Sequence, residues 1–190
     1  MKYAADPFAE GLSFHDSLPL SWKELSEVPA SSTLLKLNQR NLSLLQSVLL
    51  NDDRVLDVEP ELEPLATEIE RLDQKMTLLT ELLSDLLRSH ASLPAERLVR
   101  IGAKGMSWEM SEDDLHPEQL IQLDLYLLNE VPRPLQFIGL IVGREPSRAS
   151  SDCRMTMSFV ELSEAVDSLM GRVVFRHHRR EVAMARMKAE

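Results

Sequence analysis

Apolar residues recur at alternating intervals of three and four between residues 62 and 93, without a slip in the pattern. With Leu62 as heptad position a, the a and d positions are Leu62, Leu65, Ile69, Leu72, Met76, Leu79, Leu83, Leu86, His90 and Leu93. A packed helix of a globular protein follows a period of 3.6, whereas a sustained period of 3.5 is typical of a coiled coil. We therefore predict a long self-associating helix that opens near Glu61 and ends at Pro94.

The apolar face of this predicted helix is wider than an a/d seam. Leu78, Leu82 and Leu87 flank the seam at positions c, g and e, where a two-stranded coil would leave them in water. Each helix should therefore touch more than one neighbour. Either an earlier helix folds back on it, or the assembly has three or four strands, so a homotetramer is favoured over a dimer. The relative orientation of the strands stays open.

An earlier helix is predicted from Ser31, which belongs to a run of good N-cap residues. Its own row of three- and four-residue intervals contains Asn41 between leucines. Asn41 either lies in a helical seam, where a polar residue fixes the register, or faces water. Residues 31–93 are thus predicted to form a helical oligomerisation module.

From residue 96 the hydrophobic period changes from 3.5 to 2, which is typical of strands. Alternation over 121–127 and 153–159 predicts two half-buried strands, and the apolar run 135–142 predicts a buried one. Residues 97–110 supply two shorter strands that turn at 103–105. Consecutive strands without intervening helices predict an antiparallel meander closed into a small barrel, followed by a helix from 163 to about 187. The expected fold class is α+β, with an N-terminal arm (1–30) packed on a barrel unit (94–190).

Charge is distributed unevenly along the chain. The net charge is −10, which argues against general nucleic-acid binding. Residues 170–190 carry six basic against two acidic side chains, or +4, so the other 169 residues carry −14. This basic tail would either grip an anion or dock on the acidic body.

Cys153 is the one cysteine of the sequence, so neither an intrachain disulfide nor a Cys-rich metal site can form. The N-terminus has no apolar leader pattern, and the apolar runs are shorter than the roughly 18 residues that span a bilayer. We expect a cytoplasmic protein without a membrane span.

Sequence motifs for enzyme chemistry are missing. The sequence has no phosphate-binding loop, no GxGxxG, no HExxH and no GxSxG. His177, His178 and Glu181 have the spacing of metal ligands on a helix, but they stand among arginines, which repel cations. We predict no catalytic residue, no metal and no cofactor.

Four segments carry a resemblance to a known family: 97–108 around the turn at Gly105, the hairpin of 121–128 and 135–142, then 159–165, and finally 172–181. Together they resemble a PilZ domain, the bacterial cyclic di-GMP receptor module, over about residues 96–188. The resemblance implies a six-stranded antiparallel barrel with a C-terminal helix. It also implies a role in cyclic di-GMP signalling, with signalling or pilus-related proteins as partners.

The ligand motifs of the PilZ family match poorly. The D/N-x-S-x-x-G motif aligns with residues 100–105, where Arg100 and Gly102 replace the polar residues and Gly105 remains. No RxxxR motif precedes the barrel, since Arg97 and Arg100 are three apart. Gly105 is expected to serve turn geometry at positive φ.

The sequence therefore predicts a non-enzymatic oligomeric scaffold or adaptor in cyclic di-GMP signalling, without the family's usual nucleotide contacts. The alternative is a cyclic di-GMP receptor with non-standard residues. Its ligand-binding candidates are Arg97, Arg100, Lys104 and Gly105, covered by Arg176, Arg179 and Arg180 of the basic tail.

Overall fold

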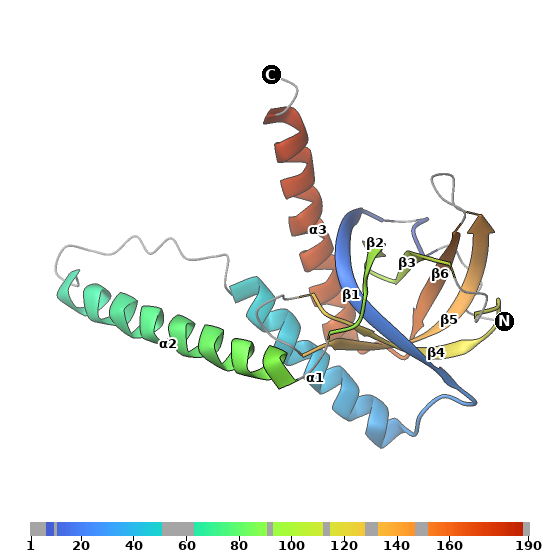
Figure 1. Cartoon of the computed structure of the whole chain (residues 1–190), viewed down its shortest axis with the longest axis horizontal. Helices are drawn as coiled ribbons and strands as arrows, with labels where there is room; N and C mark the ends of the chain where they lie inside the picture. The colour runs from blue at the N-terminus through green and yellow to red at the C-terminus, as the bar shows by residue number, and fades with distance from the viewer. Residues whose placement is uncertain are drawn as a thin grey trace.

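The computed structural model describes residues 7–9, 11–50, 63–90, 93–111, 115–127, 133–146 and 152–187. It contains six strands and three helices (Figure 1). In chain order they are β1 (Ser13–Leu25), α1 (Ser31–Leu50), α2 (Glu63–His90), β2 (Glu96–Gly102), β3 (Gly105–Met110), β4 (Leu120–Leu125), β5 (Leu135–Pro146), β6 (Cys153–Val160) and α3 (Glu164–Met187). The strands and helices predicted from the hydrophobic periods are confirmed within a few residues.

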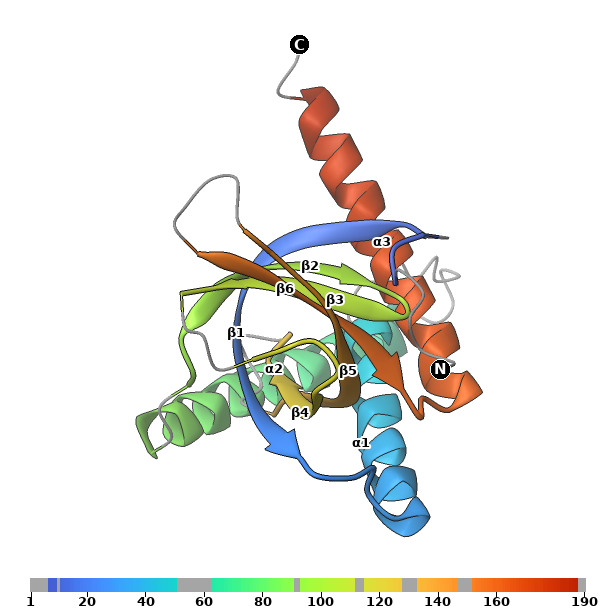
Figure 2. The same cartoon turned by 90° about the vertical axis from the view of Figure 1, so that its right-hand side faces the viewer.

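The six strands form a closed antiparallel barrel in the order β1-β2-β3-β6-β5-β4 (Figure 2). The predicted barrel is confirmed, but the predicted meander is wrong. β3 pairs with β6 instead of β4, and β4 pairs with β1. Alternating apolar residues reveal which face of a strand is buried, but they carry no information about which neighbour accepts its hydrogen bonds.

The N-terminal segment is part of the barrel wall, whereas the sequence suggested an arm packed on it. The first half of β1 pairs with β2, and the second half, from Leu20, pairs with β4. This one long strand therefore closes the barrel. Leu18, Pro19 and Leu20 are buried in succession where β1 changes partner. A pattern of alternating residues does not show where a strand changes its partner, so the closing role of this segment could not be predicted from it.

α1 packs on the barrel and on α3, side by side with the latter (Figure 2). Its buried leucines Leu44, Leu45 and Leu49 join the barrel core. Asn41 is fully buried, and neither interpretation of it holds. Its side-chain amide donates to the carbonyl oxygen of Gln136 on β5 (2.7 Å), and its carbonyl accepts from the Gln136 N–H (2.9 Å).

α2 extends to one side of the barrel (Figure 1). It is the long helix that the heptads predict, with Pro64 in its first turn, where proline is tolerated. Its a and d side chains are exposed, from 49% for Ile69 to 61% for Met76. Leu62 lies outside the described residues, and the side chain of His90 is not among those described. The coiled coil itself stays a prediction.

No helix in the described residues contains an apolar stretch that is long enough to cross a bilayer.

Candidate functional site

β2 directs the two candidate arginines to opposite faces. Side chains alternate along a strand, so positions three apart cannot share a face. Arg97 lies on the inner side with the buried Val99 and Ile101. Its guanidinium stacks 5.0 Å from the ring centroid of Trp22 and donates to the Glu109 carbonyl at 3.4 Å.

Arg100 lies on the outer wall of the barrel. Its guanidinium is 4.1 Å from the ring centroid of Phe8, and its Nε donates to Ser13 Oγ at 2.9 Å. Two cavities of about 190 and 390 Å³ lie beside it, and Arg154 also lines both of them. The Arg154 guanidinium is paired with the Glu109 carboxylate at 3.2 Å. Arg97 and Arg100 are therefore not brought together.

Lys104 and Gly105 lie at the turn between β2 and β3. The Lys104 side chain is exposed, and its carbonyl accepts from the Phe159 N–H at 2.8 Å. None of the described glycines has a positive φ. A Cβ at Gly105 would instead collide with the Met157 carbonyl oxygen and lie 2.5 Å from Pro7 Cβ. Close approach of two chain segments, rather than turn geometry, is what requires glycine here.

The three residues of α3 that have the spacing of metal ligands contact β1 instead. His177 stacks on Phe14 at 4.4 Å, and His178 Nδ1 lies 3.1 Å from the Ser13 carbonyl oxygen. The Glu181 carboxylate accepts from the backbone N–H of His15 at 3.0 Å. These three residues hold α3 against the start of β1. No group of three potential ligands for a metal ion occurs in the part of the chain that the structure describes.

A polar cluster lies where β4 meets β5. The Asp124 carboxylate accepts from the side-chain amides of Gln122 and Gln136, at 3.1 and 3.0 Å. Burial, and in second place the Asp124 charge, raise the pKa of the nearby Tyr126 hydroxyl. Its ordinary pKa is already near 10, so Tyr126 is neutral at physiological pH. Its backbone N–H donates to the Pro19 carbonyl at 3.0 Å, so the cluster belongs to the wall of the barrel.

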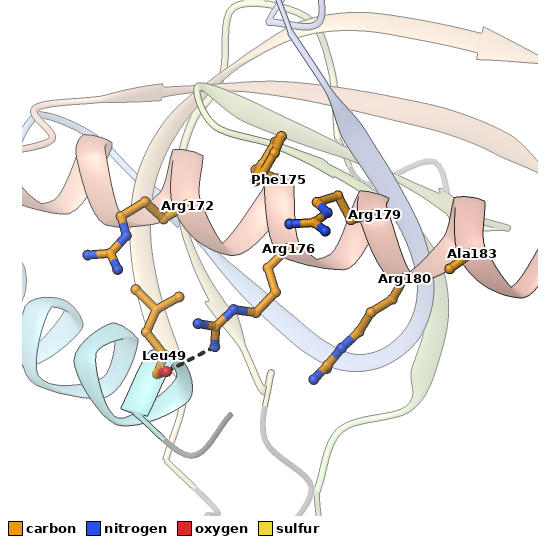
Figure 3. A pocket seen from close by; sticks show the side chains of 7 residues that line it. All are labelled: Leu49, Arg172, Phe175, Arg176, Arg179, Arg180 and Ala183. Atoms are coloured by element: carbon orange, nitrogen blue, oxygen red, sulfur yellow. Dashed lines mark hydrogen bonds between the residues drawn. The ribbon is translucent and has the colours of Figure 1, made fainter. Parts of the chain in front are cut away.

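A larger cavity, of about 520 Å³, lies between the end of α1 and one flank of α3 (Figure 3). It is lined by Leu49, Arg172, Phe175, Arg176, Arg179, Arg180 and Ala183. Arg176 donates to the Leu49 carbonyl oxygen at 2.9 Å. The sequence marked three of these arginines, but Arg172, Leu49 and Phe175 were missed. The basic density of residues 170–190 was the available signal, and only the fold shows that α1 supplies the opposite wall.

The basic tail docks on the barrel, which is one of the two roles that the sequence left open. One side of α3 docks on the barrel through Val166, Met170, Val173 and Val174, which are buried. Another side gathers arginines around the cavity. This cavity and the two beside Arg100 have no residue in common, so the tail arginines and the β2 arginines form separate clusters.

Residues 44–187 match the family model described as "Atypical PilZ domain, cyclic di-GMP receptor". No curated protein matches the sequence.

The solved structures that are similar to this chain include the following two. One is a pathogenic protein from Xanthomonas campestris, described as a tetrameric PilZ domain that self-assembles via an unusual helical bundle. It is 22% identical, with 93% of each chain covered and a TM-score of 0.73. The other is the Bacillus subtilis inhibitor of motility, MotI/DgrA. It is 8% identical, with a TM-score of 0.45 and coverage of 90% of this chain and 51% of that one.

Proposed function

The chain belongs to the atypical PilZ domain family, and on that premise we propose that it is a non-enzymatic, self-assembling scaffold in bacterial cyclic di-GMP signalling. In this proposal α2 joins the copies, and the barrel with α1 and α3 is the unit that each copy presents. Its partners are other signalling or pilus-related proteins of the cytoplasm, where the single Cys153 stays reduced.

The exposed apolar stripe of α2 is the observation that carries this proposal. Its members in the described residues are Leu65, Ile69, Leu72, Met76, Leu79, Leu83 and Leu86, all about half exposed or more. A contiguous apolar surface on a soluble chain marks an interaction site, because each leucine left in water forgoes about 1.5–3 kcal/mol of burial. Leu78 and Leu82 are exposed beside the stripe, which widens the surface beyond a two-stranded seam.

Tetramer formation is supported by two independent features. The width of the apolar surface favours more than two helices around one axis. The Xanthomonas campestris protein, which shares this fold, is described as a tetramer held by a helical bundle. We carry that mode of assembly over to this chain, with α2 as the helix of the bundle.

The geometry of the barrel wall supports a scaffold that lacks the family's usual nucleotide contacts. Arg97 faces inward against Trp22, and Arg100 is occupied by Phe8 and Ser13. Arg100 and Gly102 also stand where the motif has a carboxylate or amide and a hydroxyl. The acceptor oxygen of the motif's first residue and the hydroxyl of its serine are therefore missing at these two positions.

Solution mass tests the assembly. Replacing Leu72 and Leu79 by Asp places two charges in the apolar stripe, and desolvating them would cost more than the association gains. We expect the parent protein to have the mass of about four chains of 21.6 kDa and the double variant to have that of one, measured by light scattering.

The matched control carries the same two charges outside the seam, as Gln74→Asp with Thr77→Asp, at heptad positions f and b. It should keep the mass of the parent protein. A parent protein that is already a monomer, or a Leu72→Asp/Leu79→Asp variant of unchanged mass, contradicts the proposal.

The second candidate function is a cyclic di-GMP receptor that binds through non-standard residues. The observation in its favour is that Arg100 and Arg154 line two adjoining cavities on the outer wall. Calorimetric titration with cyclic di-GMP tests it. If Arg100 contacts the ligand, Arg100→Gln should weaken binding by roughly tenfold or more, since a charged hydrogen bond is lost. Unchanged affinity in Arg100→Gln excludes this wall as the site.

A further inference from the structure

Four arginines gather around the cavity between α1 and α3, although the rest of the chain is strongly acidic. We propose that this cavity binds a small ligand with two phosphate groups and an aromatic base. Its location differs from the wall around Arg100, and neither the family match nor the similar structures assign it. The choice of a dinucleotide as the ligand class rests on the proposed role in cyclic di-GMP signalling, whereas the site itself does not depend on self-assembly.

The spacing of the arginines suits a ligand with two anionic groups. Arg172, Arg176 and Arg180 follow one another at intervals of four, and their guanidinium groups project from the same flank of α3 (Figure 3). Each interval rises about 6 Å along the helix, so the row spans about 12 Å. A guanidinium offers a planar fork of donors that matches a phosphate, and it stays charged at any physiological pH.

One arginine of the row is held in place by the fold. Arg176 is half-buried, and it donates to the carbonyl oxygen of Leu49, in the last turn of α1. Carbonyl groups in the last turn have no partner within their own helix, so this bond also satisfies an acceptor of α1. Because this guanidinium in the middle of the row is already ordered, less side-chain entropy is lost when a ligand binds.

An aromatic surface lies next to the row. Phe175 is 51% exposed, whereas the two residues before it, Val173 and Val174, are buried where α3 packs on the barrel. The guanidinium of Arg179 lies 5.8 Å from the centroid of the Phe175 ring. A ring and a guanidinium next to each other offer flat, cationic surface on which a nucleobase can stack. Barrel packing does not account for an exposed phenylalanine at this position.

The size and the positive charge of the cavity disfavour cationic and neutral apolar ligands. Its volume of about 520 Å³ falls in the range of about 300–1,000 Å³ that small-molecule sites occupy. The arginines repel metal ions and amines. A neutral apolar ligand would desolvate the guanidinium groups without offering them a negative charge.

Titration with cyclic di-GMP at moderate salt tests the proposal, with inorganic pyrophosphate and guanosine as probes for the two halves of the chemistry. We expect saturable binding of cyclic di-GMP, weaker binding of pyrophosphate in competition with it, and the weakest binding for guanosine. Arg172→Gln with Arg180→Gln should weaken cyclic di-GMP binding roughly tenfold or more, because two charge-assisted contacts are removed. Phe175→Ala should weaken cyclic di-GMP binding but leave pyrophosphate binding unchanged.

The control variant, Arg40→Gln with Arg186→Gln, removes the same charge from exposed positions of α1 and α3 outside the cavity. It should bind like the parent protein. Equal weakening in both double variants would mean unspecific attraction to a basic surface and would overturn the proposal. So would absence of binding by all three probes, or loss of binding in Arg100→Gln alone.

Light scattering on the same samples separates this proposal from the scaffold proposal. The Leu72→Asp/Leu79→Asp variant should bind cyclic di-GMP like the parent protein, because the cavity lies within one chain. A parent protein that is monomeric but binds cyclic di-GMP contradicts only the scaffold proposal, and a parent protein that assembles but binds none of the three probes contradicts only the site proposal.

Discussion

Gly105 and Gly171 show how the same residue type serves two different environments. At Gly105 the β2–β3 turn lies against the Met157 carbonyl and Pro7, and there is no room for a side chain. At Gly171, on the exposed flank of α3, an added Cβ meets nothing within 4 Å. Neither position requires the left-handed backbone conformation that favours glycine, since no described glycine has a positive φ.

The two glycines therefore respond in opposite directions to alanine. Gly105→Ala should lower the free energy of unfolding by about 1–3 kcal/mol, because the backbone of β6 must move away from the new methyl group. Gly171→Ala should raise it by about 0.5–1 kcal/mol, because alanine loses less backbone entropy in a helix. Urea unfolding followed by tryptophan fluorescence measures both changes. A neutral Gly105→Ala would mean that the turn relaxes freely.

At the scale of elements, α1 is fixed to the barrel by asparagine side chains. Asn41 forms two hydrogen bonds with the backbone of Gln136. Asn38 donates to the Glu161 carbonyl at 3.0 Å and accepts from the Ser163 N–H at 3.0 Å, next to the start of α3. The amides thus add direction to an otherwise apolar contact, and they fix both the position and the rotation of the helix.

Asn41→Leu tests this attachment. The substitution keeps the volume but leaves the N–H and the carbonyl of Gln136 buried without these partners, at about 1–3 kcal/mol for each group. We expect urea unfolding to show a loss of about 2 kcal/mol or more. Gln39→Leu, at an exposed position of the same helix, should change the stability by less than about 0.5 kcal/mol. Equal stability of the Asn41→Leu protein would show that leucine packing alone holds α1.

At the scale of the whole molecule, the structural units do not correspond to the consecutive segments that the sequence suggested. α1 belongs with the barrel, because its apolar face is covered by β5 and α3. α2 keeps its stripe exposed. The barrel unit is therefore built from residues on both sides of α2, and the segment that carries the heptads is inserted into it.

Excision of that segment should separate assembly from folding. Replacing residues 51–92 by a flexible Gly/Ser linker of about twenty residues should yield a folded monomer, since the core residues that the structure describes lie outside the excised part. Light scattering measures the mass, and the near-UV circular dichroism of Trp22 and Trp108 reports whether the core is packed. A tetramer without α2, or loss of the near-UV signal, would contradict this division.

The candidate ligand residues show where sequence reasoning reached its limit. Arg97 and Arg100 are close in sequence, but the pleat of β2 sends them to opposite faces. Arg172, Arg176 and Arg180 lie on one flank because helical spacing brings every fourth residue together. The Leu49 wall of their cavity is contributed by a helix more than 120 residues earlier, and no local pattern contains that contact.

The sequence by itself determined the type and position of most elements, because hydrophobic periods of 3.5 and 2 arise from the geometry of the single helix and the single strand. It also determined the family, through the order of those elements around the turn at Gly105. The tertiary structure decided the closure of the barrel by β1, the pairing of β3 with β6, the covering of α1, and the meeting of α1 with the arginines of α3. These are contacts between segments that are distant in the sequence. Which segments pair depends on how the whole chain buries its apolar surface, and no single segment contains that information.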